Sequence, residues 1–317
     1  MNLTTGVVMA TYNGARYIEE QMESIVGQTV TPDVIVVVDD SSTDATPHIL
    51  KEYARRCDNI LVYENQENMG CIRTFVKGIS LCKADYIALS DQDNIWHPEK
   101  LEKCLLHMRQ NKGCGLCYHD ADLIYEDGTP LGASLWELSD LHYPLSQEEA
   151  QEILVGTRVP VLGFTLVFES ELKEYIMQNP GDAFCSHDWW ISAIGFFLYA
   201  PVYIETGLTH FRLHRNQESG AMDCLLENTK FQVKKRITDW QRIKRNLHRI
   251  HYNLFHNRAV KAKRERDRRR REMEFVDAIE AFLGIIEQKG KTDNRTDRSM
   301  ITSILLEKKK ELGRSAS

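Results

Sequence analysis

The chain repeats one order of elements four times within its first 110 residues: a short apolar strand, a polar loop and an amphipathic helix. The clearest strand is the aliphatic run 34–38, which is followed by an acidic loop and a segment with apolar residues at helical spacing. Because parallel neighbouring strands are joined by helical crossovers, four such units predict a mostly parallel sheet flanked by helices. Later apolar runs at 115–125 and 161–170 are predicted to be strands, and 186–198 a helix. The sequence therefore predicts an α/β fold.

The charged residues divide the chain into two regions. Residues 1–222 carry 15 Lys and Arg against 32 Asp and Glu, a net charge of −17, whereas residues 223–317 carry 25 against 14, a net charge of +11. The second region has a helical pattern and no convincing strand. This asymmetry predicts an acidic α/β domain over 1–222 and a separate basic helical region over 223–317.

Composition is that of a globular protein. The 317 residues are 42% hydrophobic, enough for a sizeable core, and no apolar run has the length of a transmembrane helix. The N-terminus lacks the basic segment and cleavage site of a signal peptide, and the eight cysteines are scattered, so a cytoplasmic location is expected. Cys114 and Cys117, with His119 nearby, have half the spacing of a zinc site, but no second pair lies close, which favours strand-core cysteines.

Two carboxylates, Asp91 and Asp93, follow the apolar run 86–89. In open α/β sheets ligands bind beyond the carboxyl ends of the strands, and side chains two residues apart in an extended segment point the same way. Paired carboxylates repel unless a cation or a proton neutralises them, and Mg²⁺ or Mn²⁺ accepts such oxygen ligands together with substrate phosphates. From these residues alone two alternatives stay open, a metal site and a capped helix start with acids near the positive end of the helix dipole.

Polar side chains also follow the first two strands. Thr11, Tyr12 and Asn13 come after the first strand and Asp40 after the second, and such loops meet along one edge of a parallel sheet. The first loop lacks the G-x-G-x-x-G pattern of dinucleotide-binding proteins, and the chain has no Walker A motif. An acidic loop at this place suits hydrogen bonds to a nucleotide base or ribose.

Five segments, in this order and spacing, resemble the family 2 glycosyltransferases with the GT-A fold: "MATYNGARYIEEQMESIVGQT", "VVVDDSSTD", "ENMG", "ADYIALSDQDNIW" and "SHDWW". The elements "SDQD-x-IW", "HDWW" and "FRLH" are similar to a bacterial rhamnosyltransferase-like branch of that family. The likeness covers roughly residues 3–220. It implies a GT-A, Rossmann-like domain, with the basic helical region after it.

The resemblance implies a donor site at the paired carboxylates. Asp93 matches the main ligand of a divalent metal, Mg²⁺ or Mn²⁺, and Asp91 matches a neighbouring contact to the metal or the sugar. Residues 210–220 match a mobile loop that closes over the diphosphate in the family. There His214 matches a position that reaches the metal or a phosphate, and Arg212 is expected to contact the donor. The sequence has Arg215 where glycine is commoner, which leaves the loop conformation open.

The nucleotide would be bound by the first two loops. By the same resemblance Asp40 would hydrogen-bond the base, and Thr11, Tyr12 and Asn13 would line the nucleotide pocket.

The acceptor side is implied by later segments. Asp188 matches the catalytic base of the family, which takes the proton of the acceptor hydroxyl as its oxygen attacks the anomeric carbon. Ser186 is predicted to cap the helix that carries Asp188. Gly163 and Thr165 match an acceptor-side strand and are expected to line the acceptor pocket.

The implied activity is inverting transfer of a sugar from a nucleoside-diphosphate donor. The donor would be a dTDP- or UDP-sugar, with rhamnose favoured by the likeness to the rhamnosyltransferase-like branch. The acceptor would be a glycan or a lipid-linked glycan in cell-surface polysaccharide synthesis.

Two other functions are alternatives. The segment "DQDNI" resembles the nucleophile loop of haloacid-dehalogenase-like phosphatases, but that loop normally follows the first strand, and the later lysine and acidic pair are not apparent. The basic segment 258–272 could bind nucleic acid, but no aromatic residues interleave it and the first 222 residues are acidic. Nucleic acid is therefore not the expected partner.

Apolar residues in the basic region recur on one face of a predicted helix over 229–257: Val233, Ile237, Trp240, Ile243, Leu247, Ile250 and Leu254. This stripe could pack on the α/β domain or form a homodimer. It could also hold the protein peripherally on the inner membrane face, since basic residues near an anionic surface contribute about 1 kcal/mol each. Binding to anionic but not neutral vesicles would distinguish the membrane hypothesis from packing.

Overall fold

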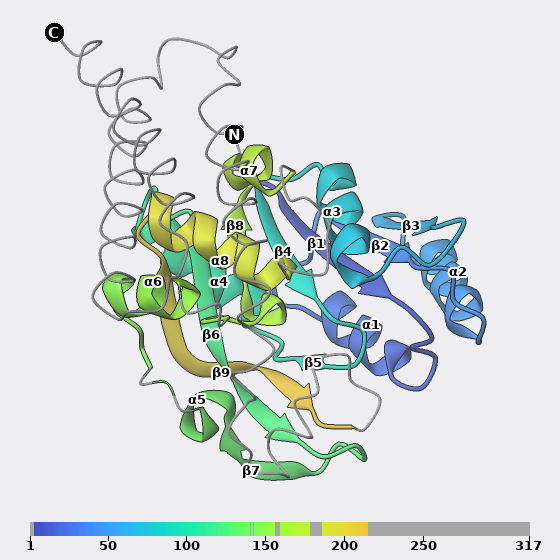
Figure 1. Cartoon of the computed structure of the whole chain (residues 1–317). Coiled ribbons are helices and arrows are strands. Elements are labelled where there is room, and N and C mark those ends of the chain that lie inside the picture. The colour runs from blue at the N-terminus through green and yellow to red at the C-terminus, as the bar shows by residue number, and fades with distance from the viewer. Residues whose placement is uncertain (1–2, 140, 142, 156–158, 178–185, 215–317) are drawn as a thin grey trace, which may run out of the picture.

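The computed structural model describes residues 3–139, 141, 143–155, 159–177 and 186–214 (Figure 1). The predicted basic region 223–317, with its amphipathic helix, its basic segment and the predicted membrane or dimer contact, lies outside the described residues, and so does Arg215. No helix among the described residues is long and apolar enough to cross a lipid bilayer.

One sheet organises the described part of the chain, with the strand order β3-β2-β1-β4-β8-β6-β9-β5 and with β7 paired to β6. Its strands are β1 (Thr5–Thr11), β2 (Val34–Asp39), β3 (Ile60–Glu64), β4 (Tyr86–Ser90), β5 (Ile95–Trp96), β6 (Leu116–Ile124), β7 (Pro130–Ser134), β8 (Val167–Glu169) and β9 (Val202–Arg212). The first four strands are mutually parallel, as predicted, and β9 is parallel to β6. Antiparallel pairs join β8 to β4 and to β6, and β5 to β9.

Helices cover both faces of this sheet. They are α1 (Ile18–Val26), α2 (Thr46–Arg56), α3 (Cys71–Leu81), α4 (Lys100–Gln110), α5 (Leu135–Leu138), α6 (Gln147–Val155), α7 (Lys173–Ile176) and α8 (His187–Leu198), with short 3-10 turns η1 (Gly163–Thr165) and η2 (Ser170–Leu172). In α1 the buried residues Ile18, Met22 and Ile25 follow helical spacing, so one stripe packs on the sheet while the acidic face meets solvent.

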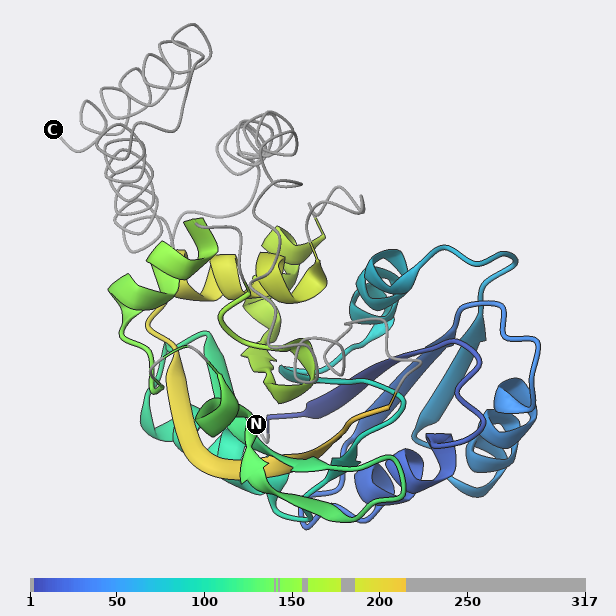
Figure 2. The same ribbon diagram turned by 60° about the horizontal axis from the view of Figure 1, so that its bottom comes forward.

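The alternation of side chains along the strands divides the core into two layers. Val8 and Val36 point to the layer shared with α3, α6, α7 and α8, whereas Val7 and Ile35 point to the layer shared with α1, α2 and α4. Figure 2 shows the two helical layers on opposite sides of the sheet. Because both faces are covered, these strands are apolar throughout, which made them visible in the sequence.

The functional edge of the sheet follows from strand direction. The carboxyl ends of β1, β2 and β4 meet at one edge, and β9, which is parallel to β6, brings its last residues to that same edge. Strand β8 runs antiparallel to β4, so its beginning and the preceding turn η1 lie beside the end of β4. Segments far apart in the sequence are thus brought together at this edge.

The predicted elements differ from the structure at three strands. Residues 210–212, expected in a loop, are the end of β9, which was not predicted and curves past the β6–β7 hairpin (Figure 1). Strands β5 and β7 were also not predicted, because one has two residues and the other is exposed and contains glycine.

Candidate active site

The loops after β1 and β2 are fastened to each other. Thr11 Oγ1 donates to Asp39 Oδ1 at 2.8 Å, and the backbone N–H of Asn13 donates to Ser42 Oγ at 2.8 Å. Asn13 has a φ of 48°, a left-handed conformation that asparagine tolerates, and its side-chain oxygen accepts from the backbone of Thr43 at 2.8 Å. These contacts leave the ring of Tyr12, 46% exposed, facing solvent beside a fixed backbone.

Asp40 is buried, and its carboxylate accepts hydrogen bonds from the segment just before α3. Its carboxylate accepts from Asn65 Nδ2 at 2.6 Å and from the backbone N–H groups of Met69 and Gly70, both at 2.8 Å. Gly70 has a φ of +84°, which favours glycine, and this conformation presents the amide to Asp40. In this conformation Asp40 ties the segment before α3 to the end of β2, and its contact with a base stays a prediction.

Asp91 and Asp93 lie in the short segment between β4 and β5, as predicted. Burial, the charge of Asp93 and the charge of Asp188 together raise the pKa of Asp91 to about 7. Asp93 Oδ2 lies 2.9 Å from Nε2 of His214, whose ring packs on Tyr17 with centroids 4.8 Å apart. The structure therefore brings Asp91, Asp93, Asp188 and His214 into one electrostatic cluster.

Gln92, between the two carboxylates, was not singled out from the sequence. Its Oε1 accepts from the Tyr12 backbone N–H at 2.9 Å, and its Nε2 donates to the Tyr12 carbonyl at 3.1 Å. A Cβ at Gly14 would lie 2.2 Å from that Oε1, so glycine is required for this approach. The side-chain amide of Gln92 thus makes two hydrogen bonds to the backbone of Tyr12, as a neighbouring strand would, and these hold the loop after β4 against the loop after β1.

Arg212 is only 2% exposed and binds protein atoms on three sides. Its Nε donates to the Asp93 carbonyl at 3.1 Å, one terminal nitrogen donates to the Glu126 carbonyl at 2.9 Å, and the other pairs with the Glu20 carboxylate. The side chain therefore fixes the Asp93 backbone in this conformation. Its predicted contact with the donor stays a prediction.

Asp188 stands in the first turn of α8, and Ser186 caps that helix as predicted, accepting from the Trp189 N–H at 3.1 Å. Asp188 Oδ1 lies 2.7 Å from Nε2 of His187. A Cβ at Gly163, in η1, would lie 2.2 Å from the same Oδ1, so the absence of a side chain there makes room for the carboxylate. The structure thus places Gly163 next to Asp188. Thr165 is buried, and its hydroxyl donates to the Leu162 carbonyl at 2.7 Å.

The carboxylate oxygens of Asp91 and Asp93 are suitable ligands for a hard divalent cation. Within the described ranges no group of three His, Cys, Asp or Glu side chains forms a ready-made metal site. However, Mg²⁺ is usually bound by one or two carboxylates with substrate phosphates and water, not by a complete protein cage. Besides burial, the charges of Asp93 and Asp188 raise the pKa of Asp91, and a bound cation relieves such a concentration of negative charge, so Asp91 and Asp93 fit such an ion.

Lys100 was not identified from the sequence. It is completely buried at the start of α4. Its Nζ donates to the Phe164 carbonyl at 2.6 Å and to Thr209 Oγ1 at 3.2 Å, and it lies 3.6 Å from the centroid of the Trp96 ring. Lys100 thereby connects η1, β9 and β5. Burial lowers the pKa of Lys100 to about 7, against the opposing attraction of groups that include Asp91.

We expect Lys100→Met to change how stability depends on pH. Between pH 7 and 10.5 the unfolded chain holds a proton on this lysine that the folded chain has released, so the free energy of unfolding of the wild type rises with pH there. The methionine variant lacks this contribution, and the difference between the two should change by up to about 1.4 kcal/mol per pH unit. Urea unfolding at several pH values measures it, with Lys103→Met on the surface as the control; parallel curves for wild type and Lys100→Met would contradict the assignment.

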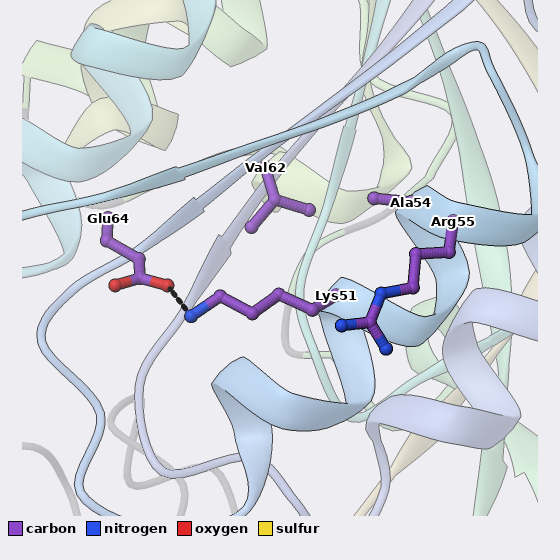
Figure 3. A pocket seen from close by; sticks show the side chains of 5 residues that line it. All are labelled: Lys51, Ala54, Arg55, Val62 and Glu64. Carbon is purple, nitrogen blue, oxygen red and sulfur yellow. Dashed lines mark ion pairs between the residues drawn. The ribbon is translucent and has the colours of Figure 1, made fainter.

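A shallow hollow of about 390 Å³ lies elsewhere, between α2 and β3. It is lined by Lys51, Ala54, Arg55, Val62 and Glu64, and Lys51 pairs with Glu64 at 2.7 Å across it (Figure 3). None of the predicted site residues lines this hollow.

Comparison of the sequence with known proteins gives a family match. The model of glycosyl transferase family 2 matches residues 6–166, half of the chain. The dTDP-rhamnosyl transferase RfbG of Shigella flexneri is 30% identical over 224 residues, which cover 67% of this chain and 74% of the relative. The putative teichuronic acid biosynthesis glycosyltransferase TuaG of Bacillus subtilis is 27% identical over 257 residues, 73% of this chain and 96% of the relative. Three uncharacterised mycobacterial proteins match at 34% identity over 125 residues, so the match spans 36% of their length.

Two solved structures share the fold. Staphylococcus aureus TarS in complex with UDP-GlcNAc has a TM-score of 0.58, with 14% identity, over 99% of this chain and 91% of that chain. The mannosyltransferase PcManGT from Pyrobaculum calidifontis, in complex with GDP-Man and Mn²⁺, has a TM-score of 0.50, with 14% identity, over 96% and 79%. At such identities the likeness concerns the fold alone, and it confirms the predicted α/β fold of GT-A type.

Proposed function

The chain belongs to glycosyl transferase family 2, and on this premise we propose that it transfers a sugar from a nucleoside-diphosphate donor to an acceptor hydroxyl, with inversion at the anomeric carbon. The observation that carries the proposal is that Asp188, in the first turn of α8, lies close enough to Asp91, which follows β4, for its charge to act on that carboxylate. The charge of Asp188 contributes to the raised pKa of Asp91, although the two residues come from segments far apart in the sequence. An inverting transfer needs such a pair of sites, one for the leaving group and one for the attacking hydroxyl.

The donor side of the site would hold the nucleoside diphosphate. The exposed ring of Tyr12, the interlocked loop at Thr11 and Asn13, and Asp40 would bind the nucleoside, while Asp91, Asp93 and His214 would face the diphosphate. A divalent cation bound to Asp93 and Asp91 would stabilise the negative charge that develops on the departing nucleoside diphosphate. The complex of PcManGT with GDP-Man and Mn²⁺ supports this expectation for a protein of the same fold.

Asp188 would act as the general base. Its carboxylate takes the proton of the acceptor hydroxyl while that oxygen forms a bond to the anomeric carbon, and the bond from this carbon to the diphosphate oxygen breaks with its electron pair. The position of the carboxylate over Gly163 supports this role, because the acceptor-side segment then lies directly beside the base.

The donor sugar is proposed from similarity. RfbG supports dTDP-rhamnose, and TarS shows that a protein of this fold binds UDP-GlcNAc. TuaG supports a role in the synthesis of a cell-surface polysaccharide, with a glycan or lipid-linked glycan as acceptor. The family assignment disfavours the phosphatase alternative, in which an Asp of the 91–95 segment would attack phosphate.

A panel of nucleotide-sugars tests the function. Wild-type protein is incubated with dTDP-rhamnose, UDP-GlcNAc, UDP-glucose and GDP-mannose, each with Mg²⁺, with Mn²⁺ and with a chelator. We expect one dTDP- or UDP-sugar to raise the melting temperature and to release nucleoside diphosphate only when a divalent cation is present. If no donor stabilises the protein and a phosphate monoester instead traps an aspartyl-phosphate, the proposal is wrong.

We expect Gly163→Ala to lower turnover more than donor affinity. The added methyl would lie 2.2 Å from Asp188 Oδ1, so the carboxylate or the η1 backbone must move. Misplacing a reacting group by about 1 Å can slow an enzyme roughly 100-fold. Steady-state kinetics at saturating acceptor measure the change, and calorimetric binding of the donor controls for folding. A variant with normal turnover would mean that Asp188 is not held against η1 during the reaction.

A further inference from the structure

We infer that His187 is a positioning residue for the proposed base, because its imidazole holds one oxygen of the Asp188 carboxylate and is itself held by α3. The inference rests on the proposed function for the role of Asp188. The side chains of His187 and Asp188 are 9% and 19% exposed, and the distance from Nε2 to Oδ1 is 2.7 Å. This contact engages Oδ1 alone, and the reaction requires an oxygen that accepts the proton of the acceptor hydroxyl.

Helix α3 supports the imidazole from the other side. The ring of His187 stacks on Phe75, with centroids 4.1 Å apart and planes at 23°, and Cys71 at the start of the helix is a polar neighbour that raises the pKa of the imidazole. The imidazole therefore has a stacking surface and two polar neighbours, which leave it little freedom to rotate. The chain Cys71–His187–Asp188 links the helix before the donor loop to the proposed base.

The position of Gly163 independently indicates that the fold makes room for this pair. Adjacent residues of a helix do not normally face each other, yet His187 and Asp188 meet at the start of α8. They meet above Gly163, where a Cβ would lie 2.2 Å from Asp188 Oδ1 and 2.8 Å from His187 Nε2. The side-chain space that glycine leaves empty is thus filled by both ends of the ion pair.

The charges around the pair give His187 a further effect on the base. Burial lowers the pKa of His187, but the charge of Asp188, which lies 2.7 Å away, and the polar neighbour Cys71 outweigh burial and raise the pKa well above its ordinary value. Among the described residues, the titratable groups that act on the pair include Cys71 of α3 and Asp91 of the β4–β5 segment. A protonated His187 therefore offsets the repulsion between Asp188 and Asp91, and so holds the Asp188 carboxylate in place before the acceptor binds.

Two substitutions distinguish the role of the His187 N–H donor from the role of its ring, which packs on Phe75. His187→Phe keeps the ring over Phe75 and removes the donor, whereas His187→Gln keeps a donor and removes the ring. We expect H187F to lower kcat by about 10- to 100-fold, the range for removing a polar partner of a charged group, with an unchanged Kd for the donor nucleotide. H187Q should retain kcat within about fivefold of wild type, since its amide can still donate. His107→Phe on α4 is the matched control.

The result that overturns the inference is a wild-type kcat in H187F, or an equal loss in H187F and H187Q accompanied by equal losses of melting temperature. If H187F does not fold, Cys71→Ala and Cys71→Ser test the same support. The alanine variant should lower kcat several-fold and the serine variant should restore it; equal kcat in wild type and C71A would overturn the inference.

A measurement without turnover distinguishes this inference from the proposed function. An NMR titration of the His187 ring in metal-free protein should give a pKa above the ordinary value of histidine. The pKa of His187 should be lower in the Asp188→Asn variant than in the wild type. If wild-type protein transfers no sugar while this titration behaves as expected, the proposed function fails and the ion pair stands. If the titration is the same in wild type and Asp188→Asn, His187 does not hold Asp188, whatever the activity.

Discussion

Asp93→Ala should abolish sugar transfer together with the metal-dependent part of nucleoside-diphosphate binding. Asp93 presents a carboxylate to His214 at 2.9 Å on the proposed donor side of the site, and alanine removes this carboxylate but keeps the backbone carbonyl that Arg212 binds. Loss of a cation that contributes several kcal/mol of charge stabilisation would slow the reaction by about 10³-fold or more. Because the carbonyl contact remains, we expect the fold to survive.

Calorimetry of dTDP and UDP with and without Mg²⁺ or Mn²⁺ measures this effect. The wild type should bind more tightly when the cation is present, and the Asp93→Ala variant should show no such difference. Asp58→Ala, an exposed acid in the turn before β3, is the control and should behave like the wild type. Equal metal-dependent binding by wild type and Asp93→Ala would show that Asp93 is not a ligand.

The parts of the fold that were predictable are those where one physical demand dominates. Strand β2 is buried on both faces, so its sequence is continuous aliphatic and can be recognised without tertiary information. Strand β9 gives no such signal, because buried and exposed positions do not alternate regularly along it. Its pairing with β6 shifts register near Gly207, where a Cβ would lie 2.6 Å from the Asp122 carboxylate. Such an irregularity depends on the partner strand and cannot be inferred from local periodicity.

The candidate site was predictable to a similar degree. The carboxylates at the ends of β2 and β4 follow strands that the sequence predicts, and a parallel sheet places both ends at its carboxyl edge. Gln92 and Lys100 were missed because their roles depend on distant partners, the backbone of Tyr12 in one case and the Phe164 carbonyl in the other. A glutamine between two aspartates and a lysine in an amphipathic helix have no local pattern that distinguishes them from surface residues.

Arg212 illustrates how the structure changes the interpretation of a residue without removing it from the site. The sequence places a cation close to the expected diphosphate loop, which suggests a direct contact with phosphate. In the described conformation the guanidinium binds the carbonyls of Asp93 and Glu126 and the carboxylate of Glu20 instead. An arginine buried in this way holds the loop that carries Asp93, so it can affect donor binding through that loop.

Asp188→Asn should separate catalysis from donor binding. The amide has nearly the size of the carboxylate, so it fits over Gly163, and the Ser186 cap of α8 is unchanged. The variant cannot accept the acceptor proton, and loss of a general base typically slows turnover by about 10²- to 10⁴-fold. Its Kd for the donor nucleotide in the presence of metal should stay within about twofold of wild type, because Asp188 is proposed to contact the acceptor and not the diphosphate.

Turnover at saturating acceptor, the calorimetric Kd and the anomeric proton of the product decide this prediction. Wild-type product should have the inverted anomeric configuration by NMR, since a single displacement has no covalent sugar intermediate that would retain it. Asp58→Asn is the control for a change of charge on the surface. Near-normal turnover of Asp188→Asn would assign the base to another residue, whereas loss of donor binding with turnover would place Asp188 on the donor side. Asp93→Ala and Asp188→Asn should therefore differ in donor binding, whose metal-dependent part the first should lose and the second should keep, because the two carboxylates are proposed to act on opposite sides of the anomeric carbon.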